Sequence, residues 1–587
     1  MMASIGVAAC GTPADSEFAS RAQGQSVTAG STPACAALTT HSTTTLDVIP
    51  TKSRTLSGFS GFATEDIISA MSPTLGAYQS QVRGLLPAFL RIPAGTPSEA
   101  YSYATGAYVS SWYGGWWYGG ETNQYGEWGH FLDVMSPKPS LSTYASLSRA
   151  VGAGAVVYVI NTANDTGTTA GQIAAWCYAN GVTCDYELGN EPYADNVSAH
   201  SSNWATKSGS TWTHSGASYM SFVRPYVDAI VANDPRTTYD VIVPLNATNW
   251  EDTSSPFTSW DDGGSGVLDF LNADNGWSNQ GRVSAVSVHS YPCGLSGSST
   301  IPGIESCLMS YLYTYANPWA SNLVKGAAGR KVYVTEFNSG VEGNTTDIDR
   351  PDLHYPGSPT YIRGRQFNAM WAASALLQYA YAGIYRVGFQ KLYGDYFAAI
   401  DAKDHHLADV YDSWSTDPSA TVDTTSYAWN LYYTATGEAL RIVNGAMNQK
   451  DGLYPVSIGG GDGHINSLAF GNGDGHYAVL AVNNGSYNEE LNVRVKGESI
   501  GSSTMYYEWG SGTDPDLSEN WMNGTTPANR CTWAKTCGAV SCATCTGAWW
   551  LAGDSGGTDN TSNVAMSSCA ATHTVSIGPY AVVQLWF

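Results

Sequence analysis

Short apolar runs alternate with longer amphipathic stretches from residue 89 to about residue 388. Polar or turn residues bound each run, and in the stretches between them apolar residues recur at three- and four-residue spacings. Parallel strands joined by crossover helices produce this rhythm. We interpret as strands 88–92, 155–160, 186–188, 240–243, 283–288, 331–335 and 385–389. The intervening helices include 140–151, 169–180, 219–232 and 365–382.

The pattern favours an α/β fold in which the strands close into a (β/α)8 TIM barrel. A doubly wound open sheet is the alternative, but no Gly-rich phosphate-binding turn supports it. After residue 440 the pattern changes to strict alternation, which predicts an antiparallel β-sandwich. The alternating segments are 465–470, 477–482, 491–495 and 581–587.

These patterns predict four parts of the chain. Residues 1–38 form an N-terminal segment whose start is at best a clipped signal region, because it lacks a basic stretch. Residues 39–54 are rich in Thr and alternate, so we expect them to add a strand to the sandwich. Residues 55–440 form the catalytic barrel. Residues 441–587 form the C-terminal β-sandwich, with a Cys-rich insertion.

The composition narrows the class of ligand. Only 13% of the 587 residues are charged, whereas there are 63 Gly, 37 Tyr and 20 Trp, a balance typical of extracellular proteins that bind sugars through aromatic faces. The net charge of -23 would repel phosphate backbones and anionic membranes. No apolar run approaches the roughly 20 residues of a membrane span. We therefore expect a saccharide substrate, and neither a nucleic acid nor a membrane as partner.

The cysteine spacing indicates an oxidising compartment and hence a secreted protein. Cys177 with Cys184 and Cys293 with Cys307 have the spacing of local disulfides. A further cluster comprises Cys531, Cys537, Cys542, Cys545 and Cys569. Zinc binding by this cluster is the alternative to disulfides. Glycosylation sequons fit the same compartment and begin at Asn164, Asn196, Asn246, Asn344, Asn484, Asn523 and Asn560.

Two glutamates stand at the carboxyl ends of predicted strands. Glu191 follows Asn190 after one strand, and Glu336 closes an apolar strand three strand-helix units later. In a barrel of this type the carboxyl ends of the strands carry the catalytic residues. Retaining glycoside hydrolysis needs one carboxylic acid and one nucleophilic carboxylate about 5 Å apart. Each glutamate alone is more often an ordinary strand-end carboxylate, but the joint pattern predicts Glu191 as acid/base and Glu336 as nucleophile.

The motifs around these glutamates resemble a known group. Leu188–Pro192 and Val334–Glu336 are similar to the acid/base and nucleophile motifs of the clan A retaining glycoside hydrolases. Phe89–Thr96 resembles the second-strand motif of glycoside hydrolase family 79, the heparanase and β-glucuronidase family, although Pro-Ala replaces its first glycine region. Pro579–Val583 is also similar to that family. The resemblance covers roughly residues 55–587, and the clan motifs are its specific part.

The resemblance implies roles for four further residues. Asn190 would bind the sugar 2-hydroxyl, and His289 and Tyr291 would orient the nucleophile. Arg91 would lie near the nucleophile, keeping it ionised while the acid stays protonated. Each has an alternative structural role: a strand-end amide, a buried histidine or a structural ion pair. The mechanism requires no cofactor and no metal, and no ligand cluster in the sequence points to one.

An aromatic loop and several arginines complete the predicted substrate site. Trp116 and Trp117 lie in a loop dense in aromatics, which would stack on sugar rings or pack on itself. The family resemblance implies a β-linked uronic acid, and the arginines that could bind its carboxylate are Arg350, Arg363 and Arg365. The net charge argues against heparan sulfate, a dense polyanion.

The function that these features favour is a retaining, β-glucuronidase-like exo-glycosidase. The alternative enzyme is another clan A hydrolase, of arabinofuranosidase, xylosidase or galactosidase type, acting on wall polysaccharide. A non-catalytic sugar-binding barrel protein is the alternative of a different class. Intact glutamates at both positions speak against the binding protein.

Overall fold

The chain forms two compact units that interleave along the sequence. One unit comprises Met1–Ser57, Tyr361–Leu377 and Tyr433–Phe587, and the other comprises Gly58–Thr360 and Gln378–Tyr432. The structure is a computed structural model. It describes residues 40–56, 58–64, 76–99, 101–104, 107–108, 140–193, 206–208, 211–213, 215–246, 266–273, 275–293, 301–339, 366–392, 398–402, 431–433, 435–448, 450–485, 488–496, 505–510, 573–577 and 581–586.

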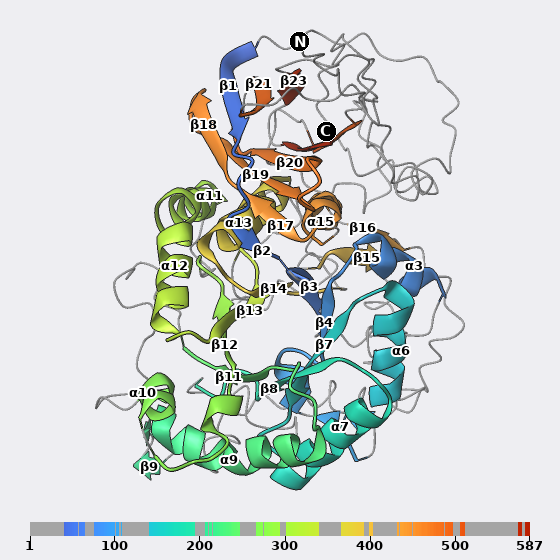
Figure 1. Ribbon diagram of the computed structural model, residues 1–587, viewed down its shortest axis with the longest axis vertical. Coiled ribbons are helices and arrows are strands. Elements are labelled where there is room, and N and C mark those ends of the chain that lie inside the picture. The colour runs from blue at the N-terminus through green and yellow to red at the C-terminus, as the bar shows by residue number, and fades with distance from the viewer. Residues whose placement is uncertain are drawn as a thin grey trace, which may run out of the picture. The chain divides into compact units, whose positions relative to one another are not determined.

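The second unit contains a closed barrel of eight parallel strands (Figure 1). In barrel order the strands are β3 (Ser60–Ala63), β4 (Phe89–Ile92), β7 (Ala155–Ile160), β8 (Cys184–Leu188), β11 (Val241–Pro244), β12 (Ala285–Ser290), β13 (Lys331–Phe337) and β14 (Arg386–Phe389). Pairing of β14 with β3 closes the barrel. The predicted barrel is confirmed, and the open sheet is excluded.

Helices connect the barrel strands and lie around the outside of the barrel (Figure 1). They are α3 (Gly76–Gly84), α6 (Leu141–Val151), α7 (Gly167–Ala179), α9 (Gly216–Asn233), α10 (Val267–Asn272), α11 (Ile301–Ser310), the π-helical turn η3 (Tyr311–Tyr315) and α12 (Ala316–Gly326). A further helix, α13 (Gln366–Ala382), follows β13 in the chain. Ser140 caps α6 through a capping box, and Gly152 ends it in the left-handed conformation.

Short elements occupy parts of the loops. Two 3₁₀ turns, η1 (Thr96–Glu99) and η2 (Gln280–Arg282), precede β5 and β12 respectively. The two-stranded ribbons pair β5 (Tyr101–Ser102) with β6 (Ala107–Tyr108), β9 (Thr206–Ser208) with β10 (Thr211–Thr213), and β15 (Ile400–Ala402) with β16 (Leu431–Tyr433).

The barrel interior changes from apolar to charged along its strands. An apolar cluster in the barrel comprises Phe89, Ala155, Val157, Ile242, Ala285 and Tyr333. Side chains alternate between the faces of a strand, so the interior positions two residues further on carry the next layer. In three strands these positions are Arg91, Ser287 and Thr335, all buried. Polar side chains, including the charged Arg91, therefore lie toward the carboxyl ends of these strands, next to the apolar cluster.

The first unit contains two sheets that share one apolar core. The larger has the order β2 (Arg54–Thr55), β17 (Gly452–Tyr454), β19 (Ile465–Gly471), β20 (Tyr477–Asn483), β24 (Ala581–Trp586) and β22 (Met505–Gly510). The smaller has the order β18 (Val456–Gly460), β1 (Thr40–Val48), β21 (Asn488–Val495) and β23 (His573–Ile577). Helix α15 (Ala435–Met447) contacts the larger sheet.

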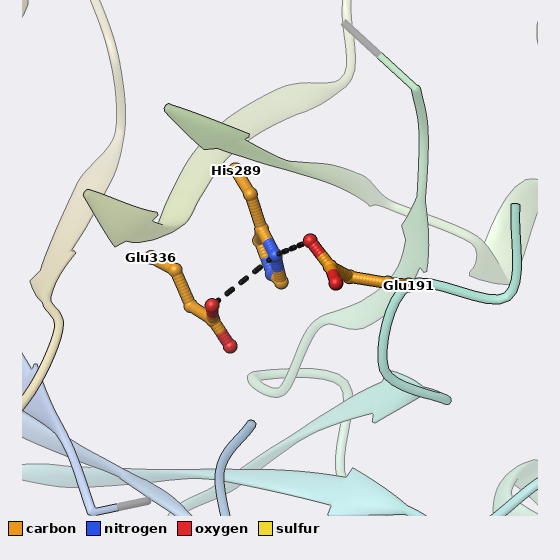
Figure 2. A group of neighbouring side chains, drawn as sticks. All are labelled: Glu191, His289 and Glu336. Atoms are coloured by element: carbon orange, nitrogen blue, oxygen red, sulfur yellow. Dashed lines mark hydrogen bonds and ion pairs between the residues drawn. The ribbon is translucent and has the colours of Figure 1, made fainter. Parts of the chain in front are cut away.

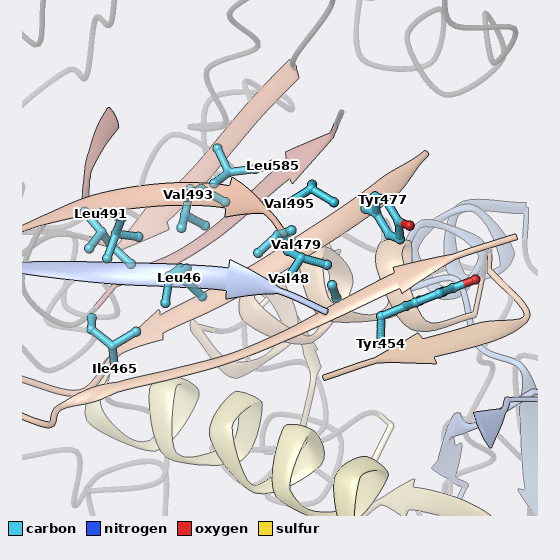
Figure 3. Close-up of a cluster of buried hydrophobic side chains, with 14 of the residues drawn as sticks. Leu46, Val48, Tyr454, Ile465, Tyr477, Val479, Leu491, Val493, Val495 and Leu585 are labelled. Carbon is cyan, nitrogen blue, oxygen red and sulfur yellow. The ribbon is translucent and has the colours of Figure 1, made fainter. Parts of the chain in front are cut away.

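Side chains from both sheets meet in one buried cluster (Figure 3). Leu46 of β1 lies in it with Val493 of β21, Val479 of β20 and Leu585 of β24. The sequence predicts an antiparallel sandwich here, and most strand pairs are antiparallel, but β1 and β21 are parallel. No hairpin joins β1 to its neighbours, so no turn fixes its direction, and β1 runs parallel to β21 and antiparallel to β18.

Two predicted disulfides are present. Cys177 in α7 is bonded to Cys184 at the start of β8, and Cys293 is bonded to Cys307. The cluster from Cys531 to Cys569 lies outside the described residues. Among the described helices, none is long and apolar enough to cross a membrane.

The side chains of two asparagines in glycosylation sequons donate hydrogen bonds within the fold. Asn484 is buried, and its amide nitrogen donates to Ser374 Oγ at 2.8 Å. The amide nitrogen of Asn164 donates to the carbonyl oxygen of Glu99 at 2.9 Å. A glycan has no room at the buried Asn484, so we do not expect glycosylation there in the folded protein.

Candidate active site

The candidate site lies at the carboxyl ends of four of the eight barrel strands. Arg91 comes from β4, Glu187 from β8, His289 from β12 and Glu336 from β13. Of these residues, Arg91 and Glu187 are fully inaccessible, and His289 and Glu336 are each 5% exposed. The strands β12 and β13 shift register between Val288 and His289, which places His289 opposite Glu336.

Two residues with left-handed backbone conformation form the turn after β8 and position Asn190 and Glu191. Gly189 has φ 82° and Glu191 has φ 40°. A Cβ atom on Gly189 would lie 2.5 Å from Thr162 Oγ1, so only glycine fits there. The hydroxyl of Tyr219 donates to the carbonyl oxygen of Leu188 and supports the turn from α9. A non-glycine residue with positive φ is strained, and such strain concentrates at functional sites.

Arg91 joins the polar side chains of the barrel interior. Its Nε donates to Glu187 Oε2 at 2.5 Å, its Nη1 to Glu336 Oε1 at 2.5 Å, and its Nη2 to Asn190 Oδ1 at 2.9 Å. The other oxygen of Glu187 accepts from Ser287 Oγ at 2.7 Å and Thr335 Oγ1 at 2.8 Å. Fixed partners therefore hold the guanidinium in one orientation.

His289 lies between the two glutamates (Figure 2). Its Nδ1 is 2.8 Å from Glu191 Oε1 and 3.3 Å from Glu336 Oε2. The hydroxyl of Tyr291 donates to Glu336 Oε2 at 2.7 Å, and that of Tyr193 lies 3.5 Å from Glu191 Oε1. The side chain of Glu191 is 33% exposed, whereas that of Glu336 is 6% exposed. Glu191 is thus the member of the group that faces solvent.

The charges of these groups shift one another's pKa. Burial alone would raise the pKa of Glu191, but the charge and hydrogen bond of His289, together with the charge of Arg91, hold it below its ordinary value. Burial alone would lower the pKa of His289, but Glu336 and Glu191 raise it above its ordinary value. Both shifts favour an ion pair in which a proton on His289 is hydrogen-bonded to Glu191, whereas the resemblance implies a proton on Glu191.

The two catalytic candidates are close together. The ligand atoms of Glu191, His289 and Glu336 all lie within 4.8 Å of one another, so one carboxylate oxygen of each glutamate falls within that distance. Retaining glycosidases hold their carboxyl groups about 5 Å apart, whereas inverting enzymes leave about 6.5–9.5 Å for a water molecule. The arrangement fits direct attack by one carboxylate on a sugar that the other protonates.

The structure brings together six of the predicted site residues. They are Arg91, Asn190, Glu191, His289, Tyr291 and Glu336. Trp116, Trp117 and the three candidate arginines lie outside the described residues. Sequence reasoning missed Glu187, although a signal was present: it alternates with Asp185 in a strand whose five residues are all buried. Two acidic residues facing one side of a buried strand indicate a charged interior.

Comparison with solved structures identifies barrels of the same fold. The α-L-arabinofuranosidase of Thermotoga maritima, in its arabinose complex, is 13% identical with TM-score 0.54, covering 93% of this chain and 99% of that one. The GH51 arabinofuranosidase of Xanthomonas axonopodis pv. citri is 11% identical with TM-score 0.56, covering 93% and 100%. A family 44 endoglucanase of Clostridium acetobutylium is 11% identical with TM-score 0.53, covering 93% and 99%.

Comparisons by sequence add nothing to this result. No protein-family model matches the chain, and no curated protein matches it. At 11 to 13% identity, the similarity to these three glycoside hydrolases shows a shared fold along nearly the whole of each chain. None of the solved structures named here belongs to the β-glucuronidase family that the sequence resembles.

Proposed function

We propose that the protein is a retaining glycoside hydrolase with Glu336 as nucleophile and Glu191 as general acid/base. The observation that carries this proposal is the pair of glutamates at the ends of β8 and β13, with carboxylate oxygens within 4.8 Å. Their unequal surroundings support the two roles. Glu336 is fixed by Arg91 and Tyr291, whereas Glu191 is more exposed and shares a proton with His289.

In the first step Glu336 attacks the anomeric carbon and the glycosidic bond breaks. Glu191 donates a proton to the leaving oxygen. Glu191 receives this proton from His289 across their 2.8 Å hydrogen bond. A bound sugar would exclude water from Glu191 and favour its neutral form. In the second step Glu191 accepts a proton from water, which attacks the glycosyl–enzyme ester and releases Glu336 with retention.

Two sugars are candidates for the substrate. A β-glucuronoside is supported by the resemblance of Phe89–Thr96 to the β-glucuronidase motif. An α-L-arabinofuranoside is supported by the arabinofuranosidases among the structural neighbours. We also propose that the enzyme acts outside the cell, since disulfides such as Cys177–Cys184 persist in oxidising compartments.

Mechanism-based labelling tests the nucleophile, the mechanism and the sugar together. The intact protein is incubated with fluorinated or cyclitol probes of glucuronic, arabinofuranosyl, xylosyl, galactosyl and glucosyl configuration, and its mass is followed with time. We expect one equivalent of label on Glu336 from one configuration, and none in Glu336→Gln. Sugar binding by Glu336→Gln without labelling of the wild type by any probe would favour the sugar-binding protein instead.

Glu191→Gln separates the acid/base role from the nucleophile. An activated aryl glycoside needs no protonation, so it should still label Glu336, whereas release of the sugar should slow by about 10²–10⁴-fold. Azide, a nucleophile that needs no general base, should restore turnover and give a glycosyl azide of retained configuration. Unchanged turnover in Glu191→Gln would exclude Glu191 as the acid/base.

A further inference from the structure

Three potential metal-ligand atoms converge at the mouth of the site (Figure 2). They are Glu191 Oε1, His289 Nδ1 and Glu336 Oε2, and all lie within 4.8 Å of one another. Glu191 comes from the turn after β8, His289 from β12 and Glu336 from β13, so the three residues are far apart in the chain and the sequence shows no metal motif. This cluster can do more than catalyse hydrolysis. The lone pairs that share a proton can also bind a metal ion.

The charges around this cluster favour a divalent cation. The carboxylates of Glu187, Glu191 and Glu336 carry three negative charges, and Arg91 compensates one of them. With His289 neutral, the group therefore has two negative charges in a largely buried place. A proton on His289 offsets one of them, whereas a divalent ion offsets both. Low local polarity strengthens this attraction.

The ligand types favour a transition metal over calcium or magnesium. Imidazole nitrogen with carboxylate oxygen suits zinc and copper, whereas calcium and magnesium prefer oxygen alone. Bonds of about 2.0–2.2 Å to one ion place ligand atoms roughly 3 Å apart, as the two distances from His289 Nδ1 already are. The partly exposed Glu191 leaves the ion a path from solvent.

We propose that Glu191, His289 and Glu336 bind one divalent copper or zinc ion, and that the bound ion excludes the sugar substrate. The ion takes the lone pairs that Glu336 needs for attack and Glu191 needs for proton transfer. Tyr291 and Arg91 remain on the other positions of the Glu336 carboxylate. The site is therefore inhibitory, and its affinities should follow copper above zinc above manganese.

Binding is tested first without substrate, so that the result does not depend on the proposed function. The full chain is titrated with cobalt(II), a spectroscopic substitute for zinc, and its visible absorption is recorded with zinc as competitor. Loss of a ligand in Glu191→Gln or His289→Asn should weaken metal binding by at least about 10–100-fold. Substitution of residues that only orient a metal ligand already lowers metal affinity by about that factor. His464→Asn is the control, because His464 is exposed and 4.0 Å from Asp462 in the other unit.

Inhibition is tested on whichever glycoside the labelling experiment identifies. Copper and zinc should raise the apparent KM and leave kcat unchanged, and EDTA should restore activity. Competitive inhibition by metal in the wild type and in His464→Asn would support the proposal. An ion that lowers kcat without competing, or cobalt absorption that survives both Glu191→Gln and His289→Asn, would overturn the proposal and leave the glycosidase assignment intact.

Discussion

A single buried arginine determines much of the site at the scale of residues. Burial lowers the pKa of Arg91, but the charges of Glu187 and Glu336 raise it above its ordinary value. A buried charge costs several kcal/mol unless partners compensate it. The sequence predicted Arg91 near the nucleophile through resemblance alone. Glu187 escaped prediction because no catalytic pattern requires it, although it is the partner that permits a cation at that depth.

Removal of the Glu187 charge should destabilise the barrel. Glu187→Gln keeps the size of the side chain but leaves Arg91 with one carboxylate, so we expect a loss of roughly 3–5 kcal/mol. Urea unfolding measures the effect. Asp47→Asn is the matched control, because the Asp47–Arg494 pair is largely exposed and should change the midpoint little. Equal losses in the two variants would contradict the importance of the buried pair.

Asp165 provides a pH test at the same scale. Burial raises its pKa to about 7, above the value near 4 of an unfolded chain. The folded protein thus binds an extra proton between these values, and stability falls as the pH rises from about 4 to about 7. Asp165→Asn removes this dependence. We expect it to stabilise the protein by on the order of 1–3 kcal/mol at pH 8 and to have little effect at pH 4.

Thermal unfolding at both pH values measures this difference. Tyr226→Phe is the comparison, since the Tyr226 hydroxyl bonds the backbone oxygen of Asp165 and not its carboxylate. That variant should cost stability equally at the two pH values. A stabilisation by Asp165→Asn that did not depend on pH would argue against a buried, uncompensated carboxylate.

At the scale of elements, apolar periodicity predicts seven of the eight barrel strands and fails at the first. Strand β3, Ser60–Ala63, is as long as β4, β11 and β14, but its sequence Ser-Gly-Phe-Ala has only one large apolar side chain, so no apolar run marks it. Gly61 is required because a Cβ atom there would lie 2.4 Å from the backbone oxygen of Phe89. Close packing between β3 and β4 therefore requires a glycine where an apolar side chain would have revealed the strand in the sequence.

The turn after β8 gives a prediction about local geometry. Gly189→Ala adds a Cβ atom against Thr162 in a left-handed residue, so it should cost about 1–3 kcal/mol and displace Asn190 and Glu191. The value of kcat/KM should fall with stability. Gly152→Ala is the control: it has φ 80° but nothing within 4 Å, so it should cost stability alone. Full activity in Gly189→Ala would show that the turn tolerates the shift.

At the scale of the whole molecule, the first unit is assembled from segments at both ends of the chain. Leu46 and Val48 of β1 belong to the same buried cluster as residues from 454 to 585. Period-two alternation predicts strands in both the N-terminal and the C-terminal segment, but it does not specify the direction in which the strands pair. That is why the parallel contact between β1 and β21 could not be read from the sequence.

Truncation of Leu46 tests the contribution of β1. Leu46→Ala removes a fully buried side chain and should cost about 2–5 kcal/mol in the unfolding of the first unit. Ile458→Ala on the neighbouring strand β18 is the control, because Ile458 is 42% exposed and should have little effect. Guanidinium unfolding compares the two. A small loss in Leu46→Ala would mean that the unit holds together without β1.

Strand β1 is synthesised long before the strands with which it pairs, so its pairing is delayed. Thr44 of β1 bonds Glu489 of β21, 445 residues further along the chain. At about 5–20 residues per second, a ribosome needs roughly 20–90 s to produce that partner after β1 has been made. For that time β1 exists as an unpaired strand with apolar residues. The first unit therefore cannot complete its smaller sheet until β18 and β21 have been synthesised.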